Sequence, residues 1–142
     1  MKSAFPLQKV LEHRKRIYEI KLQELERLRS ELSNLENERK LLVAEYERLN
    51  QEIMSLDNEM ILMKPLYDKY KDRVKKAIEN VEDRIAKKRI EIEGKKKEVV
   101  DALNDKKIME KLKEKHIIDY REFLKKEELK LIDELVITRF NR

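Results

Sequence analysis

Apolar residues recur in the first half of the chain at alternating steps of three and four residues. Between Leu25 and Met63 this pattern covers twelve positions, and eleven of them are apolar; only Arg39 interrupts the row. A repeat of about 3.5 residues is typical of the buried seam of a left-handed coiled coil. The pattern predicts a long first helix at about residues 5–63. Its seam positions are Leu25, Leu28, Leu32, Leu35, Arg39, Leu42, Tyr46, Leu49, Ile53, Leu56, Met60 and Met63.

The second half carries a looser apolar stripe that runs from Tyr67 to Phe140. It predicts a second helix at about residues 65–140, with the bend between the helices at about residues 64–65. Proline removes a helix hydrogen bond and disfavours helix in the residue before it, whereas it suits the first turn of a new helix. Pro65 is therefore the preferred breaking point, and Asp57-Asn58 is a weaker alternative.

A short link between two long amphipathic helices makes them antiparallel neighbours. The expected fold class is all-α, with two long helices forming an antiparallel coiled-coil hairpin as a single domain over residues 1–142. A bend at residues 64–65 would bring together residues whose numbers sum to about 129. About the last fifteen residues would then extend past the N-terminus with an apolar stripe that has no partner in the hairpin. We expect partner binding there, with dimerisation and a frayed helix end as alternatives.

The composition argues against catalysis. Charged residues make up 46% of the chain, which has one glycine, two prolines and no cysteine. A single glycine cannot build a phosphate-binding loop, and a two-helix hairpin offers its carboxylates no water-poor cleft. We therefore expect no enzyme activity, no cofactor and no small-molecule substrate. Apolar runs stay well short of the roughly 20 residues that span a bilayer, which favours a soluble cytoplasmic protein.

Two charged features raise other possibilities. The net charge of +5 comes from residues 65–142, with the clusters Lys87-Lys88-Arg89 and Lys95-Lys96-Lys97. Acidic residues surround both clusters, so a solvated helix face is a better interpretation than a nucleic-acid site, whose affinity would fall steeply with salt. His13 and His116 also sum to 129 and are expected to lie close together. Metal binding needs three or four converging ligands, so we expect no metal site.

Several segments at the two ends of the chain resemble the flagellar FliJ family. The resemblance covers the whole chain in order and position, and it includes the length and the two-helix plan. It rests on Phe5-Pro6-Leu7-Gln8-Lys9-Val10-Leu11-Glu12-His13-Arg14, Leu22-Gln23-Glu24-Leu25, Met109-Glu110-Lys111-Leu112-Lys113-Glu114-Lys115, Tyr120, Asp133-Glu134-Leu135 and Arg139-Phe140-Asn141-Arg142.

This resemblance implies a role in flagellar type III protein export. FliJ proteins are non-enzymatic stalks of the hexameric export ATPase; they also contact the cytoplasmic domain of the export gate, handle export chaperones and work at the cytoplasmic face of the inner membrane. The helix ends would enter the ring, which implies Leu131, Leu135, Arg139 and Phe140 as ring-binding residues. Matches to the gate-contacting pattern imply Leu42, Tyr46, Tyr70, Val74 and Ala77, although Val81 stands where the family pattern has a histidine.

Other functions remain open at this point. The equivalent stalk of a virulence-type secretion system would carry nearly the same sequence features. A nucleic-acid-binding coiled coil would use the lysine clusters, and a generic scaffold would tolerate changes at Tyr70 or in the last fifteen residues.

Overall fold

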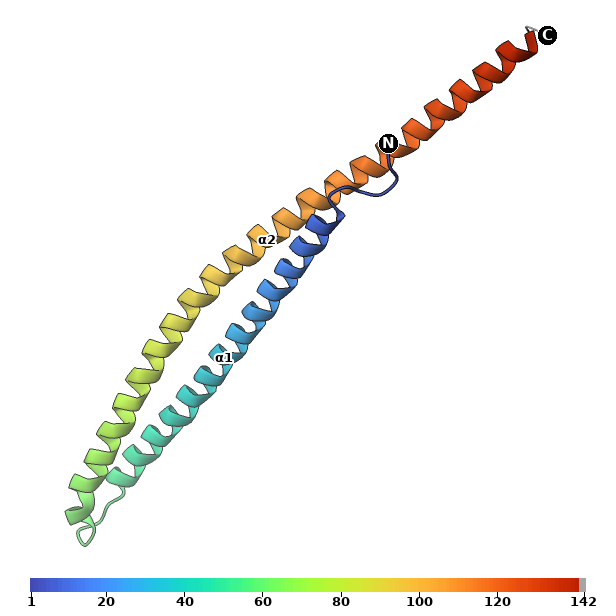
Figure 1. Cartoon of the computed structure of the whole chain (residues 1–142). Helices are drawn as coiled ribbons and strands as arrows, with labels where there is room; N and C mark the ends of the chain where they lie inside the picture. Colours follow the sequence, from blue (N-terminus) through green and yellow to red (C-terminus); the bar gives the residue numbers. More distant parts are fainter. Residues whose placement is uncertain (141–142) are drawn as a thin grey trace. The chain divides into compact units, whose positions relative to one another are not determined.

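The computed structural model describes residues 1–140, which form two long helices joined by a short turn (Figure 1). Helix α1 spans Gln8–Met54, the single 3₁₀ turn η1 spans Ile61–Met63, and helix α2 spans Lys64–Phe140. The two long helices pack against each other in opposite directions, so the predicted all-α antiparallel coiled-coil hairpin is confirmed.

The turn lies closer to the N-terminus than the sequence predicted. We expected the first helix to reach about residue 63, but α1 ends at Met54 and the chain turns at residues 55–60. The Asp57 carboxylate accepts a hydrogen bond from the Met60 backbone N–H at 2.9 Å, and the Asp57 carbonyl accepts one at 3.2 Å from the same group. Aspartate competes with helix in this way, so the alternative bend at Asp57-Asn58 was the better one. Pro65 takes its other predicted role, in the first turn of α2.

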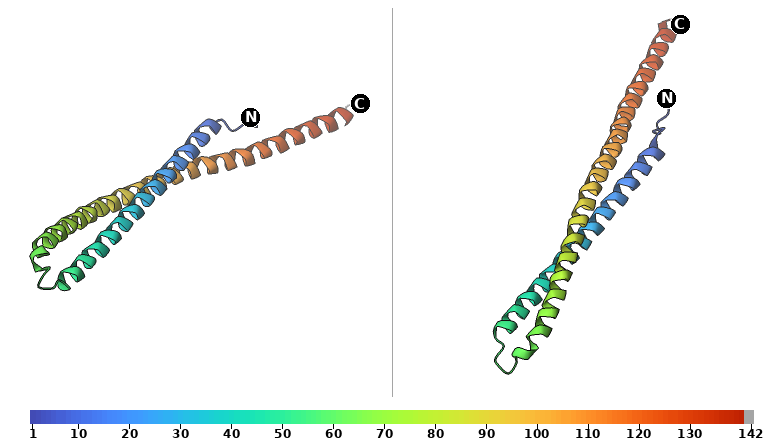
Figure 2. Two further views of the ribbon diagram at one scale, coloured as in Figure 1. Left: turned by 90° about the horizontal axis from the view of Figure 1, so that it is seen from below. Right: turned by 90° about the vertical axis from the view of Figure 1, so that its left-hand side faces the viewer.

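Contacts divide the chain into two units, and the prediction of a single domain stays a prediction. The turn unit comprises Leu22–Lys97, and the terminal unit comprises Met1–Lys21 with Glu98–Arg142. Within each unit the two helical segments run side by side in both views of Figure 2.

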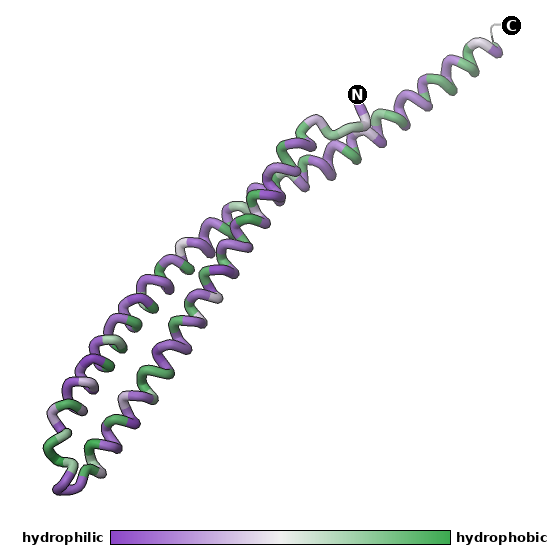
Figure 3. The backbone as a smooth tube through the Cα atoms, turned by 60° about the horizontal axis from the view of Figure 1, so that its bottom comes forward, coloured by the Kyte–Doolittle hydropathy of each residue, from purple (hydrophilic) through white to green (hydrophobic). Residues whose placement is uncertain are grey.

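The turn unit buries the seam that the apolar repeat predicted. Hydrophobic positions recur at regular intervals on both of its helices (Figure 3). Its central cluster is formed by Leu35, Val81 and Ile85. Fully burying an aliphatic side chain of this size contributes about 1.5–3 kcal/mol, so such layers account for much of the attraction between the helices. The buried residues are Leu25, Leu28, Leu35, Leu49, Val74, Val81, Ile85 and Ile92.

The terminal unit has a smaller core. Leu11 of α1 is only 1% exposed, and Val99, Ala102 and Met109 of α2 are buried with it. The N-terminal segment before α1 also contacts α2. The Phe5 ring lies 5.8 Å from the His116 ring, and His116 Nε2 lies 3.1 Å from the Lys2 carbonyl oxygen. A carbonyl can only accept, so this ring nitrogen carries the proton.

Ion pairs between the helices define the register within each unit. In the turn unit Lys88 pairs with Glu31 at 2.7 Å, and Lys95 pairs with Glu24 at 2.6 Å. In the terminal unit the Arg14 guanidinium donates to the Asp105 carbonyl at 2.9 Å. The paired numbers sum to about 120, because the register follows from the position of the turn.

The predicted sum of about 129 was therefore wrong, and so was the expected closeness of the two histidines. His116 lies against Lys2 and Phe5. These two residues precede His13 in the sequence by about ten positions, so the histidines are not opposite each other. The interruption of the seam at Arg39 also has an explanation in this register. Its guanidinium donates to the Glu82 carboxylate at 3.1 Å, near the edge of the seam, with both side chains about half exposed.

Candidate partner-binding surfaces

The end of α2 carries a run of exposed apolar side chains in the terminal unit. Every residue from 124 to 140 is exposed, and we call this segment the terminal overhang. It extends past the N-terminal segment, as the terminal unit in Figure 1 shows. Leu131 and Leu135 remain about 60% exposed, and Phe140 is 87% exposed. Its exposed apolar side chains are Leu124, Leu129, Leu131, Ile132, Leu135, Val136, Ile137 and Phe140.

These apolar side chains are spread around most of the overhang. At about 100° per residue, Leu131 and Leu135 lie roughly 140° from Val136 and Phe140, and Ile132 lies between the two pairs. A helix that packs on a single partner needs one apolar stripe, so this wider distribution fits contact from more than one side.

The ring-binding residues inferred from the resemblance all lie on this overhang. Leu131, Leu135 and Phe140 are exposed apolar side chains, and Arg139 is an exposed cation in the last turn of α2. A cation at a helix C-terminus interacts favourably with the helix dipole. The structure thus leaves all four residues accessible, and their role stays a prediction.

The inferred gate-binding residues all lie in the turn unit. Val74 is buried, whereas Leu42, Tyr46 and Ala77 are half-buried and Tyr70 is 47% exposed. The Lys71 ammonium lies 5.3 Å from the centre of the Tyr46 ring, so residues of both helices meet here. The structure brings this set together, with Val74 part of the seam and Tyr70 the accessible member.

An ionic cluster borders Tyr70. Arg48 donates to the carboxylates of both Glu45 and Glu52. The pKa of Glu45 is held below its usual value of 4.5, first by the hydrogen bond from Arg48 and further by a hydrogen bond from Tyr70, although desolvation opposes them. The same pairing raises the pKa of Arg48. The cluster therefore favours the ionised form of Glu45 on this side of α1.

The basic clusters of α2 are engaged with acidic side chains. Lys88 and Lys95 reach across to Glu31 and Glu24, and Arg89 lies 3.4 Å from Glu36. Such pairs align the two helices but add little stability each, because their members are partly exposed to water. This arrangement fits the predicted solvated face, and Lys88, Arg89 and Lys95 form their ion pairs within the hairpin.

Neither a metal-binding group nor a membrane-spanning helix is found among residues 1–140. No group of three or more histidine, aspartate or glutamate side chains in residues 1–140 is placed to hold a metal ion. None of the described helices has a stretch long and apolar enough to cross a membrane. The accessible features of both units are apolar and charged surfaces.

Sequence patterns missed the accessibility of the turn. Leu62 and Leu66 were not singled out, yet they are 85% and 59% exposed, and Met54 is 87% exposed. The sequence pattern assigned Met60 and Met63 to the buried seam, but both are exposed because α1 ends before them. The signal that could have revealed the exposed turn is the close spacing of apolar residues on both sides of Asp57-Asn58.

The two long helices, packed on each other along one apolar seam, place this chain in the class of antiparallel coiled-coil hairpins. Comparison with protein families narrows this class: the family model described as Flagellar FliJ protein matches residues 1–142. The chain therefore belongs to the FliJ family and is a non-enzymatic component of the flagellar export apparatus. Searches of curated proteins and of solved structures returned no match.

Proposed function

We propose that this chain is a stalk and adaptor of the flagellar export apparatus, working at the cytoplasmic face of the inner membrane. Its terminal overhang enters the hexameric export ATPase, its turn unit contacts the cytoplasmic domain of the export gate, and it also handles export chaperones. The action is mechanical and allosteric, because a single helix bound in a ring distinguishes the subunits it touches from the others.

The observation that carries this proposal is the wide distribution of apolar side chains around the overhang. Leu131 and Leu135 lie on one side of the helix, Val136 and Phe140 lie on another, and Ile132 lies between them. A partner that surrounds the helix would bury all of these side chains, whereas one flat partner would bury only part of them. A ring with a central opening is the partner geometry that uses the whole surface.

The first experiment is a titration of the cognate export ATPase with this chain. We expect the full chain to raise the rate of ATP hydrolysis and a chain truncated after Leu124 to leave it unchanged. The double variant Leu131→Asp/Leu135→Asp should behave like the truncation, because a carboxylate in an apolar interface is strongly disfavoured. A matched control is Leu41→Asp/Ile90→Asp, which changes two residues of the turn unit that are both 73% exposed.

Two results would contradict the stalk mechanism. One is an unchanged hydrolysis rate with the full chain when the ATPase is independently shown to form rings. The other is equal stimulation by the full and the truncated chains, which would move the contact away from the overhang. The adaptor role at the gate, or a scaffold role, would then be the better account.

The gate contact is tested separately at Tyr70. Tyr70 is the accessible member of its set, so Tyr70→Ala should weaken binding to the isolated gate domain by about tenfold while the hairpin stays folded. The matched control is Ile90→Ala on the same unit. Equal binding of the wild type and the Tyr70→Ala variant would remove this residue from the proposed gate surface.

A further inference from the structure

The turn between α1 and α2 exposes an unusual number of apolar side chains. Figure 3 shows hydrophobic positions on both sides of the turn, with hydrophilic positions between them. None of the residues of η1 is buried. Exposed apolar patches on soluble proteins mark sites of protein or membrane contact. We call this set the apolar tip: Met54, Met60, Ile61, Leu62, Met63 and Leu66.

The apolar tip covers the end of the turn unit and not one helix face. Its members come from the last residue of α1, from the turn, from η1 and from the first turn of α2. A helix groove on a partner protein accepts one stripe of a helix, and the tip does not present such a stripe. An end covered with apolar side chains is suited to shallow insertion among lipid headgroups.

The segment of α2 next to the tip is basic. Residues 64–76 contain six basic and two acidic side chains. Leu66, Lys69, Arg73 and Lys76 follow one another at steps of three, four and three, which places them on one face of the helix. All four are exposed, and Val74 of the buried seam lies on the other side of α2.

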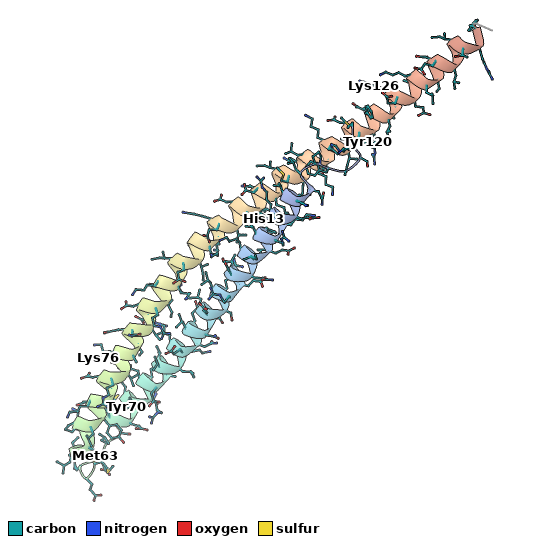
Figure 4. All side chains as sticks on the ribbon, in the orientation of Figure 1. His13, Met63, Tyr70, Lys76, Tyr120 and Lys126 are labelled. Atoms are coloured by element: carbon teal, nitrogen blue, oxygen red, sulfur yellow. The ribbon has the colours of Figure 1, made fainter. Side chains whose placement is uncertain are left out.

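These cations differ from the basic clusters farther along α2. Lys69, Arg73 and Lys76 (the last is labelled in Figure 4) form no ion pair with any described residue, whereas Lys88 and Lys95 are held by glutamates. Asp72 lies three residues after Lys69 and four before Lys76, so it borders this face, whereas Asp68 lies farther around the helix. Three cations against one bordering carboxylate leave the face with a net positive charge. We call Lys69, Arg73 and Lys76 the basic face.

We propose that the apolar tip and the basic face bind the surface of an anionic phospholipid membrane. The tip would insert its aliphatic and thioether side chains at the headgroup level, and the basic face would contact lipid phosphates. The two features reinforce each other, because stable attachment to a bilayer generally needs an apolar and an electrostatic component together. Tyr67, between Leu66 and Lys69 in the sequence, and Tyr70, directly after Lys69, are of the residue type that favours the membrane–water interface.

The test is vesicle flotation with the full chain. Vesicles of phosphatidylcholine alone are compared with vesicles that also contain phosphatidylglycerol. We expect binding to the anionic vesicles and much weaker binding to the neutral ones, with affinity falling as salt rises. The variant Leu62→Asp/Leu66→Asp should bind at least about tenfold more weakly, and so should Lys69→Glu/Arg73→Glu/Lys76→Glu.

Matched controls show whether an effect is specific to the tip and the basic face, or follows from any loss of exposed apolar or positively charged side chains. Leu41→Asp/Ile90→Asp alters equally exposed apolar residues of the same unit, and Lys87→Glu/Lys97→Glu alters exposed lysines away from the tip. Both controls should bind like the wild type. Circular dichroism should show that each variant keeps its helices, because only exposed residues are changed.

Three results would overturn the proposal. They are absent binding to anionic vesicles, equal binding to neutral and anionic vesicles, and unchanged binding of the tip or basic-face variants. Loss of swimming in cells that carry the tip variant, with no vesicle binding by the wild-type chain, would show that the tip serves a protein partner in place of lipid. The tip variants are expected to stimulate the export ATPase normally, so this test and that of the stalk mechanism can fail independently.

Discussion

Gly94 lies within α2 without any packing reason for a glycine. A Cβ added at this position would meet no atom within 4 Å. Glycine costs a helix about 1 kcal/mol relative to alanine, through its greater backbone freedom in the unfolded chain. Gly94 therefore lowers the stability of its own stretch of α2 and makes opening there easier.

The first prediction is that Gly94→Ala stabilises the chain by about 1 kcal/mol. Urea denaturation followed by circular dichroism measures the change. Ala86→Gly, at an exposed position of the same helix, is the mirror control and should cost a similar amount. A less stable Gly94→Ala variant would show that the native backbone there is not an ordinary helix.

Glu31 and Lys88 give the chain a pH-dependent contact. The hydrogen bond from Lys88 is the largest cause that lowers the pKa of Glu31 below its usual 4.5; Arg27 adds to the effect and desolvation opposes it. A lowered folded-state pKa means that the folded chain favours the ionised carboxylate. The resulting stability is present above pH 4.5 and is lost as the pH falls through the lowered pKa.

The second prediction follows from this sign. Glu31→Gln should lower the melting temperature at neutral pH, and the difference from the wild type should disappear in acid below the lowered pKa. Thermal melts across a pH series measure it, with Glu128→Gln on the overhang as a control that changes an exposed carboxylate without an ion pair among the described residues. A constant difference at all pH values would contradict the role of ionised Glu31.

At the scale of elements, the position of the turn decides which residues of the two helices meet. The 3.5-residue repeat continued through Met60 and Met63, so it gave no sign that α1 ends at Met54. Local backbone bonding at Asp57 ended the helix first, and η1 and Pro65 then started α2. A shift of the turn by about five residues changes the sum of paired residue numbers by about ten.

The third prediction tests this register by cross-linking. The chain has no cysteine, so any pair introduced into it is the only one. Leu35→Cys/Ile85→Cys, within one buried cluster, should form a disulfide under mild oxidation. Leu35→Cys/Gly94→Cys, which matches the sum of about 129, should not. Non-reducing gels distinguish the two, and the opposite result would restore the register expected from Pro65.

At the scale of the whole molecule, the hairpin pairs helices of one chain. Each unit draws its buried residues from both α1 and α2, so both units are stabilised by contacts distant in sequence. The overhang contributes no buried residue to either unit, since residues 124–140 are all exposed. Its apolar side chains are available for a partner, and in isolated protein for a second copy.

The fourth prediction is that a chain truncated after Leu124 melts at a temperature independent of its concentration. Unfolding of a monomer does not depend on concentration, whereas unfolding of a dimer does. Circular dichroism melts over a hundredfold range of concentration measure this, and sedimentation velocity of the full chain shows whether the overhang adds self-association. A midpoint that rises with concentration in the truncated chain would mean that its helices pair between chains.

The sequence by itself determined that this chain forms two amphipathic helices, and it identified the family. The 3.5-residue spacing of apolar residues and the scarcity of glycine and proline are local properties, so seam residues such as Leu35 and Val81 could be predicted from them. The accessible apolar end at Leu131 and Leu135 followed from the unequal helix lengths.

Only the tertiary structure decided the register, the extent of the overhang and the exposure of the turn. Pairing depends on where the chain reverses, and sequence patterns offered two competing breaks, at Asp57 and at Pro65, without deciding between them. Because the chain reverses at Asp57, Met60 and Met63 lie in the exposed apolar tip and not in the seam. The basic face lies next to them in the sequence. Spacing shows which residues can face a partner helix, but the position of the turn determines whether that partner is there.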